Sequence, residues 1–506
     1  MSDQKKNYSR IMKSSSIIGG AQVINMLIGM IRVKFVAILI GPIGVGLVAT
    51  YQSLTQMIGT VAGLGLQSSA VRDIAQSMGK GDQEHIGRTV LSLRRMCWLS
   101  GGLGSLAVIL LSSTLSKLTF NSPEYATEIA VVGLTILFAN LKGGQMALIQ
   151  GMRRIGDLAK LNIIGAVSGT ILSIGLYWEF GMQGIVPAIV LLSLTELCAS
   201  WWFARKVDVP KVSMSWMESF KAAGGMAKMG LVFMWNGLLL VIVAYLTRTL
   251  IAQEIDFAAV GIFSAAFALS GMFINFVLSA MGTDYYPSLT AINTDHKKMR
   301  NLVNQQTEIG LLLGVPALLA TLAFAPWVIN VFYTPEFSQS ADLLRWFALG
   351  CIGRITAWPL GYIILAKGYG KLFILTETTI NIVHFVLIIL FLHFFGIEGV
   401  AIAFPVLYII YTIMMLVVTK CLIGMSWSRG VWHLLVCMTP FIIATFGAGV
   451  FLPVIPATVI GLIITTAISL FCMRGLVIRL GTENKLSYMI LRLPLIKLIL
   501  KRDMPM

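Results

Sequence analysis

Apolar stretches long enough to cross a lipid bilayer follow one another along the whole chain. A helix needs about 20 mostly apolar residues to span the hydrocarbon core, and we place fourteen such spans at 14–40, 45–71, 90–112, 128–150, 161–178, 183–204, 226–252, 257–282, 306–332, 343–366, 371–395, 397–420, 431–452 and 454–473. Only 12% of the 506 residues are charged, about half the share in a soluble globular protein. The sequence therefore predicts an all-α, polytopic membrane protein of about fourteen transmembrane helices.

Lysine and arginine are concentrated in every second loop of this predicted membrane protein, and therefore on one side of the membrane. Cytoplasmic loops carry the excess of basic residues, and with the N-terminus inside, 31 of the 38 Lys and Arg residues fall on the inner side. One missed or extra span would invert every later loop. The distribution therefore supports the count of fourteen spans and predicts that both termini are cytoplasmic.

Two separate landmarks recur in the chain at the same offset of 215 residues. A Val-Gly pair precedes an apolar segment at 45–46 and again at 260–261, and residues 180–186 (FGMQGIV) reappear as residues 395–401 (FGIEGVA). A shared offset indicates an internal duplication of six-span halves, an arrangement in which transporters bind substrate between the repeats. We predict two pseudo-symmetric lobes, an N-lobe at 1–210 and a C-lobe at 211–424, followed by two additional spans within 425–475.

The predicted tail at 476–506 mixes leucine and isoleucine with lysine and arginine. This pattern is typical of a basic amphipathic helix that lies on an anionic membrane surface. We expect the tail to contact the inner leaflet, and a solvated charged tail is the alternative.

Common signatures of catalysis and cofactor binding are missing from the sequence. It contains no G-x-x-x-x-G-K-[ST], no H-E-x-x-H and no G-x-S-x-G, and its six cysteines form no C-x-x-C pair of the kind found in zinc sites. The formal net charge of +16 comes from scattered clusters and not from one basic stripe, so membrane topology explains it better than nucleic-acid binding does. We expect no enzymatic activity, no cofactor, no metal and no nucleic-acid partner.

Ionisable side chains inside the predicted spans are the candidates for function. Such a group costs at least a few kcal/mol in hydrocarbon, so it is retained mostly where it faces a protein interior or a watery cavity. The cations are Arg32, Lys34, Lys142, Arg248 and Arg354, and the clearest anions are Glu196 and Glu377. Cations that line one cavity would attract an anion such as phosphate, whereas the alternative is that each snorkels to an interface or pairs with a neighbouring helix.

Repetition favours the functional interpretation for three of these cations. Lys34 and Arg248 are separated by 214 residues, almost the repeat offset, and Arg32 lies beside Lys34 in the first span. For the two carboxylates, two interpretations stay open. Glu196 and Glu377 either bind a coupling ion or balance the charge of a nearby cation.

Several short motifs resemble the polysaccharide-transporter branch of the multidrug, oligosaccharidyl-lipid, polysaccharide (MOP) exporter superfamily, and specifically Wzx-type flippases for O-antigen or enterobacterial common antigen. They are residues 39–51 (LIGPIGVGLVATY), 61–66 (VAGLGL), 285–289 (YYPSL), 361–368 (GYIILAKG) and 373–377 (FILTE). The resemblance covers about residues 10–420, the twelve-span core. It rests on several motifs in the right order and not on one diagnostic signature.

The resemblance implies two six-helix lobes around a central cavity, and movement of an undecaprenyl-diphosphate-linked oligosaccharide across a bacterial inner membrane. In the family a basic residue precedes the Gly-Pro turn of the first hairpin, and Lys34 occupies that place; Arg248 matches the corresponding position of the second lobe. Lys367 and Glu377 also match family positions. The chain departs from many relatives in the pair of spans after Lys420.

The resulting hypothesis is a flippase in which Lys34, Arg32 and Arg248, with Arg354 and Lys142 as further candidates, hold the diphosphate. Its expected partners are a glycan polymerase and a chain-length regulator. One alternative is a multidrug cation antiporter of the same superfamily, although this would need carboxylates and aromatic residues in its cavity. The other is an integral-membrane glycan polymerase or glycosyltransferase, which generally needs larger outside loops or acidic catalytic motifs.

Overall fold

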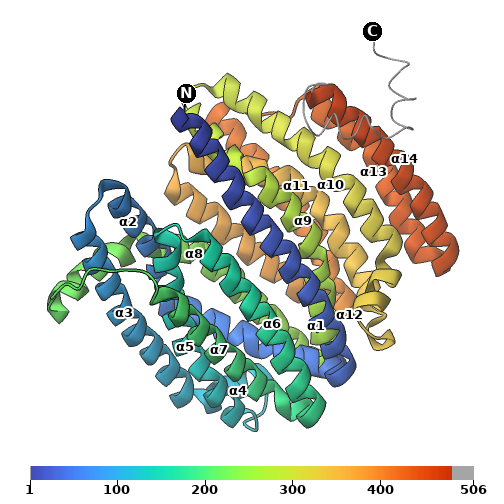
Figure 1. The fold of residues 1–506 in the computed structure, drawn as a ribbon. Helices are drawn as coiled ribbons and strands as arrows, with labels where there is room; N and C mark the ends of the chain where they lie inside the picture. Colours follow the sequence, from blue (N-terminus) through green and yellow to red (C-terminus); the bar gives the residue numbers. More distant parts are fainter. Residues whose placement is uncertain (1, 481–506) are drawn as a thin grey trace. The chain divides into compact units, whose positions relative to one another are not determined.

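The computed structural model describes residues 2–480, and every regular element in that part of the chain is helical (Figure 1). The chain divides into two compact units. Unit 1 consists of Met1–Gly261 and the short segment Phe332–Glu336, and unit 2 of Ile262–Val331 and Phe337–Met506. The predicted fold class, an all-α polytopic membrane protein, is confirmed.

Unit 1 contains eight α-helices, a 3₁₀ turn and the beginning of a ninth helix in its described residues. The helices are α1 (Ser2–Gly63), α2 (Leu66–Lys80), α3 (Gln83–Leu110), α4 (Ser112–Phe120), α5 (Ala126–Gly151), α6 (Ile155–Phe180), η1 (Gly181–Gly184), α7 (Ile185–Ala204), α8 (Trp216–Glu254) and the start of α9 (Phe257–Ala291). Helix α5 packs against α2, α3 and α7. Apolar side chains such as Ile74, Ile86 and Ile149 fill one core of this unit, and Leu54, Ile129 and Ile136 fill another.

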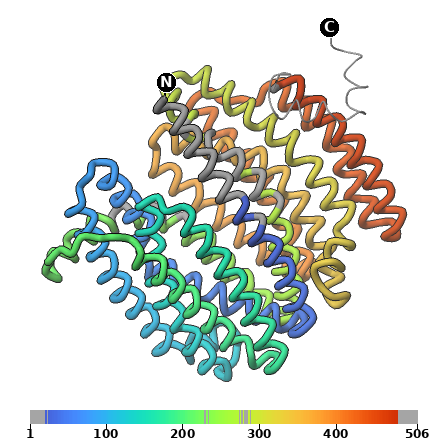
Figure 2. The backbone as a smooth tube through the Cα atoms, in the orientation of Figure 1, coloured from blue at the N-terminus to red at the C-terminus, as the bar shows by residue number. Residues whose placement is uncertain are grey.

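Unit 2 contains the rest of α9 and the remaining helices. These are α10 (His296–Phe332), η2 (Pro335–Phe337), α11 (Ser340–Ala366), α12 (Gly370–Ile423), α13 (Arg429–Phe451) and α14 (Val454–Leu480). The segment Phe332–Glu336, which includes the last residue of α10 and part of η2, belongs to unit 1. Helices α11 and α12 pack along each other, as do α13 and α14, and the last two lie side by side at the red end of the trace in Figure 2.

The number of membrane spans follows from breaks inside the longest helices. Among residues 2–480, nine helical segments are long and apolar enough to cross a membrane. Three of them, Gly20–Gly63, Ile155–Ala204 and Gly370–Ile423, have 44 to 54 residues, which at 1.5 Å per residue is enough for two crossings each. With the bent pair α3–α4 and the shorter apolar start of α9, the described helices are compatible with the predicted fourteen spans.

Two of the breaks in the long helices are separated by the repeat offset that the sequence indicates. Gly181 between α6 and α7 has φ 54° and Gly396 inside α12 has φ 59°, and the two positions differ by the offset of 215. Positive φ is strained for residues with a Cβ atom, so glycine is the residue that turns the chain here. Gly41 breaks α1 in the same way, with φ 60°.

Polar contacts hold the additional helices α13 and α14 against α10. Near the start of α10, Glu308 accepts hydrogen bonds from Arg479 Nε at 2.6 Å and from Ser428 Oγ at 3.0 Å. Near its end, Trp327 Nε1 donates to Thr458 Oγ1 at 3.0 Å. The additional pair is therefore an integral part of unit 2.

The boundary between the compact units differs from the boundary that the repeat predicts. The repeat divides the lobes at 210 and 211, whereas α8 and the start of α9 pack into unit 1 as far as Gly261. The lobe boundaries therefore stay a prediction from the repeat. Of the predicted tail at 476–506, the first five residues form the end of α14, and the rest lies outside the described residues.

Candidate functional site

Arg32 lies on the first half of α1, inside the membrane-spanning segment, and its side chain is half-buried. Its guanidinium lies against Gly169 of α6, where a Cβ atom would come within 2.9 Å of Nη1. The glycine therefore provides the room for the arginine. Among the described residues, no hydrogen bond or salt bridge to the Arg32 side chain is present.

A small cavity of about 100 Å³ adjoins Arg32. Apart from Arg32, its polar lining comes from Gln52 on the second half of α1, Ser173 and Tyr177 on α6, and Tyr333. Arg32 is the one ionisable cation of this lining. An anionic group in the cavity would therefore meet a guanidinium together with hydroxyl and amide groups.

Lys34 is positioned next to this cavity by the segment Phe332–Glu336, which belongs to unit 1. Lys34 Nζ donates a hydrogen bond to the backbone carbonyl of Tyr333, and Tyr333 itself lines the cavity. The lysine is half-buried, like Arg32. Two of the predicted cations of unit 1 are therefore close to the small cavity, Arg32 on its lining and Lys34 through its bond to Tyr333.

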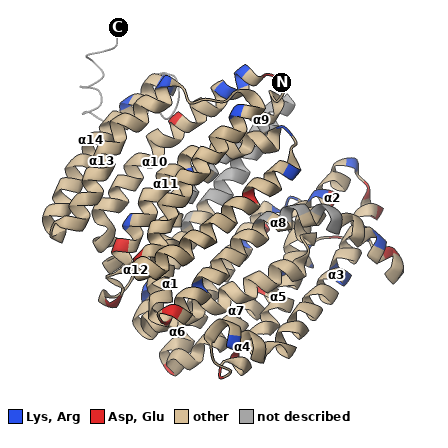
Figure 3. Cartoon of the chain, turned by 180° about the vertical axis from the view of Figure 1, so that it is seen from behind, with Lys and Arg blue, Asp and Glu red and all other residues tan. Residues whose placement is uncertain are grey.

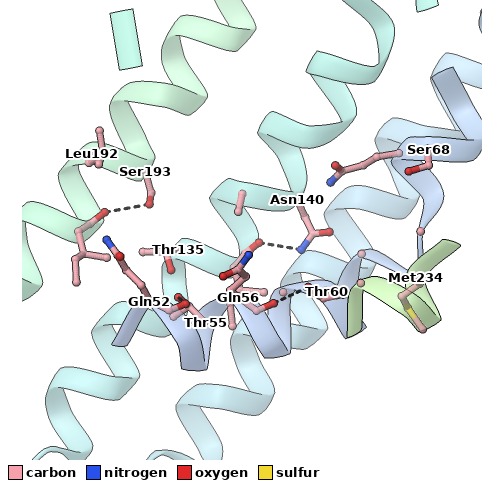
Figure 4. A pocket seen from close by; sticks show the side chains of 18 residues that line it. Gln52, Thr55, Gln56, Thr60, Ser68, Thr135, Asn140, Leu192, Ser193 and Met234 are labelled. Atoms are coloured by element: carbon pink, nitrogen blue, oxygen red, sulfur yellow. Dashed lines mark hydrogen bonds between the residues drawn. The ribbon is translucent and has the colours of Figure 1, made fainter. Parts of the chain in front are cut away.

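A larger chamber of about 510 Å³ shares Gln52, Ile189 and Leu192 with the small cavity. Figure 4 shows Gln52, Thr55, Gln56 and Thr60 on one helix opposite Thr135, Asn140 and Ser193. None of the eighteen residues that line the chamber is charged. It is therefore a neutral compartment rich in amide and hydroxyl groups beside a cationic one.

The spacing of polar residues in α1 explains how the chamber forms. Gln52, Gln56 and Thr60 are four residues apart, so they lie on one face of the helix. Gly59 and Gly63 are on the same lining and keep it open. The sequence prediction considered only charged residues and missed this chamber, although amide side chains at intervals of four inside an apolar span are a signal that would have found it.

Lys142 and Glu196 form a salt bridge, and so two of the predicted site residues are brought together. Lys142 Nζ on α5 is 2.6 Å from Glu196 Oε2 on α7, and the side chains are 26% and 27% exposed. Gly165 on α6 leaves room for the carboxylate, since a Cβ atom there would lie 3.0 Å from Glu196 Oε1. The pair joins α5 to α7, and the two charges balance each other.

Arg248 lies on α8 in unit 1 and is half-buried. Its Nη1 donates to the carbonyl of Ala244, one turn earlier, at 2.9 Å. It does not line the chamber or the small cavity. Arg248 and the Arg32 cavity are therefore separate features of unit 1.

The other predicted residues belong to unit 2. Arg354 is half-buried on α11, next to Gly353, which packs against Tyr408 of α12. Glu377, on the first half of α12, accepts a hydrogen bond from Tyr411 Oη at 2.9 Å. Lys367, at the end of α11, has its Nζ 2.8 Å from His296 Nε2.

Lysine and arginine residues, blue in Figure 3, and aspartate and glutamate residues, red, are sparse along the helices. Among the described residues, no group of three or more His, Cys, Asp or Glu side chains could hold a metal ion. Half-buried cations and neutral polar groups are available in unit 1 for binding a ligand.

A comparison with protein families decides the affiliation of the chain. Residues 35–342 match the family model for polysaccharide biosynthesis proteins. The chain belongs to this family. The part of the chain that matches the family model begins at Phe35, directly after Lys34, and it includes the chamber and the salt bridge of Lys142 with Glu196.

Curated relatives and solved structures agree with this affiliation. The chain is 24% identical over 416 residues to the lipid III flippases of Escherichia coli (strain K12) and Shigella flexneri, which covers 79% of this chain and 96% of each relative. Its fold is similar to that of an inward-facing multidrug resistance MATE family transporter of the MOP superfamily, with a TM-score of 0.67 and 15% sequence identity. The similarity covers 79% of this chain and 94% of the transporter. The fold is also similar to that of the lipid II flippase MurJ, with a TM-score of 0.64 and 13% sequence identity. This similarity covers 92% of this chain and 100% of MurJ. The resemblance to the MOP superfamily that the motifs indicated is confirmed.

Proposed function

We propose that this protein is a flippase that moves a polyprenyl-diphosphate-linked oligosaccharide from one leaflet of a bacterial inner membrane to the other. The family match, the lipid III flippase relatives and the fold shared with a lipid II flippase support this function. The predicted substrate carries an undecaprenyl chain, a diphosphate and a saccharide, so its binding site must accept an anion and a neutral polar group side by side.

The observation that carries the proposal is the setting of Arg32. A half-buried guanidinium inside a membrane span, without a carboxylate partner among the described residues, faces a cavity. Such a charge is costly in hydrocarbon, and an arginine forms paired, charge-assisted hydrogen bonds to phosphate oxygens. A diphosphate in the cavity would balance Arg32, with Lys34 close by as a second cation.

The remaining predicted site residues enter the proposal with different weights. Arg248 and Arg354 are candidates for diphosphate contacts at other stages of an alternating-access cycle. Lys142 is neutralised by Glu196, so its proposed contribution is to position helices, and Glu196 serves as the charge-balancing group. Glu377, held by Tyr411, is the remaining candidate for coupling transport to an ion, with energy from ion exchange or the membrane potential.

The surroundings of the protein follow from the same proposal. Both termini of the proposed flippase face the cytoplasm, as the distribution of lysine and arginine predicts. The protein performs transport and no covalent chemistry, and it works beside a glycan polymerase and a chain-length regulator that act on the flipped saccharide. A multidrug cation antiporter is a poorer fit, because Arg32 would repel a cationic drug from the cavity.

Transport by the purified full-length protein in lipid vesicles tests this function. The substrate is an undecaprenyl-diphosphate-linked oligosaccharide, and flipping is read as access of the saccharide to a membrane-impermeant lectin. We expect Arg32→Glu to lower the initial rate at least about tenfold, because it replaces attraction of a phosphate by repulsion. Arg32→Lys keeps the charge without the planar fork, so it should retain an intermediate rate.

Lys117→Glu is the matched control, because Lys117 is an exposed cation on α4 outside both cavities. It should flip at the wild-type rate. Each variant is compared at equal protein content and with a wild-type thermal unfolding midpoint. A folded Arg32→Glu protein that transports as fast as the wild type would overturn the proposed role of Arg32, and a wild-type protein that does not flip the lipid would overturn the function.

A further inference from the structure

The neutral chamber presents hydrogen-bonding groups that the protein itself does not use. The side-chain amides of Gln52 and Gln56 are exposed, and among the described residues neither makes a hydrogen bond to the protein. Each amide offers two donors and a carbonyl acceptor. Polar groups of this kind inside a membrane span are costly when they have no partner, which points to a ligand or water in the chamber.

Other groups on the lining are held in place by their own helices. Asn140 is 3% exposed, and its Nδ2 donates to the carbonyl of Ile136 at 3.0 Å. The hydroxyls of Thr135 and Ser193 donate to carbonyls on their own helices, so their oxygens can still accept hydrogen bonds. Figure 4 shows these residues and the two glutamines converging from different helices. The chamber is thus a built site with fixed acceptors on one side and adaptable amides on the other.

The absence of charge on the lining restricts the ligand. A carboxylate or an ammonium group would lose its hydration on entry, and no opposite charge among the eighteen lining residues would compensate. A ligand with several neutral hydroxyl and amide groups would exchange its hydrogen bonds with water for bonds with the amides. The volume of about 510 Å³ is within the usual range for small-molecule sites.

We infer that this chamber binds an uncharged sugar, the residue of the lipid-linked saccharide that is attached directly to the diphosphate. The inference rests on the proposed function and adds a substrate preference to it. Gln52 lines both the chamber and the Arg32 cavity, so a diphosphate at Arg32 and the sugar next to it would lie on either side of Gln52. The order of the two cavities then matches the order of groups in the substrate.

Binding measurements on the full-length protein in lipid nanodiscs test the inference. Three probes are compared: undecaprenyl diphosphate without a sugar, the same lipid with one N-acetylglucosamine, and the same lipid with one glucuronic acid. For the wild type, we expect the neutral sugar to tighten binding about tenfold over the bare lipid, which is what two net hydrogen bonds supply. Glucuronic acid should give no such gain.

The test variant is the double substitution Gln52→Leu and Gln56→Leu, which keeps the size of the side chains and removes the amides. It should lose the gain from N-acetylglucosamine and bind the bare lipid within about twofold of the wild type. Ser193→Ala provides a second variant with little risk to folding and should lose part of the gain. Gln183→Leu is the matched control, because Gln183 is exposed on η1 outside the chamber, and it should keep the full gain.

Several results would overturn the inference. They are equal wild-type affinity for the bare and the sugar-bearing lipid, a gain that survives in the double variant, or equal binding of the neutral and the anionic sugar. If the double variant does not fold, Ser193→Ala decides, and a full gain in that variant would also overturn the inference. These outcomes are distinct from failure of the proposed function. Transport in vesicles without tighter binding of the sugar-bearing lipid refutes the sugar subsite alone. Tighter binding of the sugar-bearing lipid without transport refutes the flippase function alone.

Discussion

Gly46 and Gly261 make the same close contact in opposite directions. Gly46, on the second half of α1, lies against the carbonyl of Phe257, and Gly261, near the start of α9, lies against the carbonyl of Pro42. The two glycines and the two carbonyls are each separated by 215 residues, and all four residues belong to unit 1. The duplication read from the sequence is therefore present as a reciprocal backbone contact.

Alanine at either glycine should destabilise the protein. A Cβ atom would collide with a backbone carbonyl that has no rotamer to change, so the helices must separate, at a cost of about 1–3 kcal/mol in the free energy of unfolding. Gly46→Ala combined with Gly261→Ala should cost less than the sum, because both clashes occur in one contact. Denaturant titration in detergent micelles measures these values.

The control for this prediction is Gly175→Ala on α6, where no atom lies within 4 Å of an added Cβ. This change should be neutral or stabilising by about 0.5–1 kcal/mol, as for glycine to alanine in an ordinary helix. Wild-type stability of Gly46→Ala would contradict the observed contact.

The salt bridge between Lys142 and Glu196 predicts strong coupling between these two positions. Lys142→Ala or Glu196→Ala alone leaves a partly buried charge without its partner and should cost roughly 1–3 kcal/mol, less than for a fully buried pair because each side chain is about a quarter exposed. The double alanine variant should cost little more than either single change. A double-mutant cycle of unfolding free energies measures the coupling, and additive effects would show that the pair does not interact in the membrane.

The start of α8 should lose protection in acid. Glu218 accepts a hydrogen bond from the backbone N–H of Ser215, which lowers the pKa of the Glu218 carboxyl below its ordinary value, and Ser215 Oγ accepts one from the N–H of Glu218. This capping box contributes its full stability above the ordinary carboxyl pKa and loses it as the pH falls through the lowered one. Hydrogen exchange of residues 216–220 should therefore become faster, relative to the intrinsic rate, as the pH falls through that range.

Glu218→Gln separates this effect from general acid sensitivity. Glutamine can complete the same capping box but has no charge to titrate, so its exchange protection should be lower than that of the wild type at neutral pH and nearly independent of pH. An identical pH profile for the wild type and Glu218→Gln would show that another group controls the fraying.

The charged candidates show how far the sequence could predict the site. It identified Arg32 and Lys142 as cations within membrane spans, and both are there. It could not tell that Lys142 meets a carboxylate 54 residues away while Arg32 meets a glycine and a cavity. Their side chains point to different neighbours because the rotation of each helix about its axis is determined by packing, and an almost uniformly apolar helix carries no strong pattern that specifies this rotation.

The amino-acid sequence alone predicts fourteen spans, the internal duplication and the residues that carry charge into the membrane. These features depend on composition, on length and on spacing along the chain, all of which are local or periodic. The folded protein was needed to show that Gln52 of α1, Asn140 of α5 and Ser193 of α7 line one neutral chamber, next to the cavity of Arg32. Which faces of separate helices meet, and at what depth, is decided by contacts between residues far apart in the chain, and single-sequence patterns do not encode those contacts.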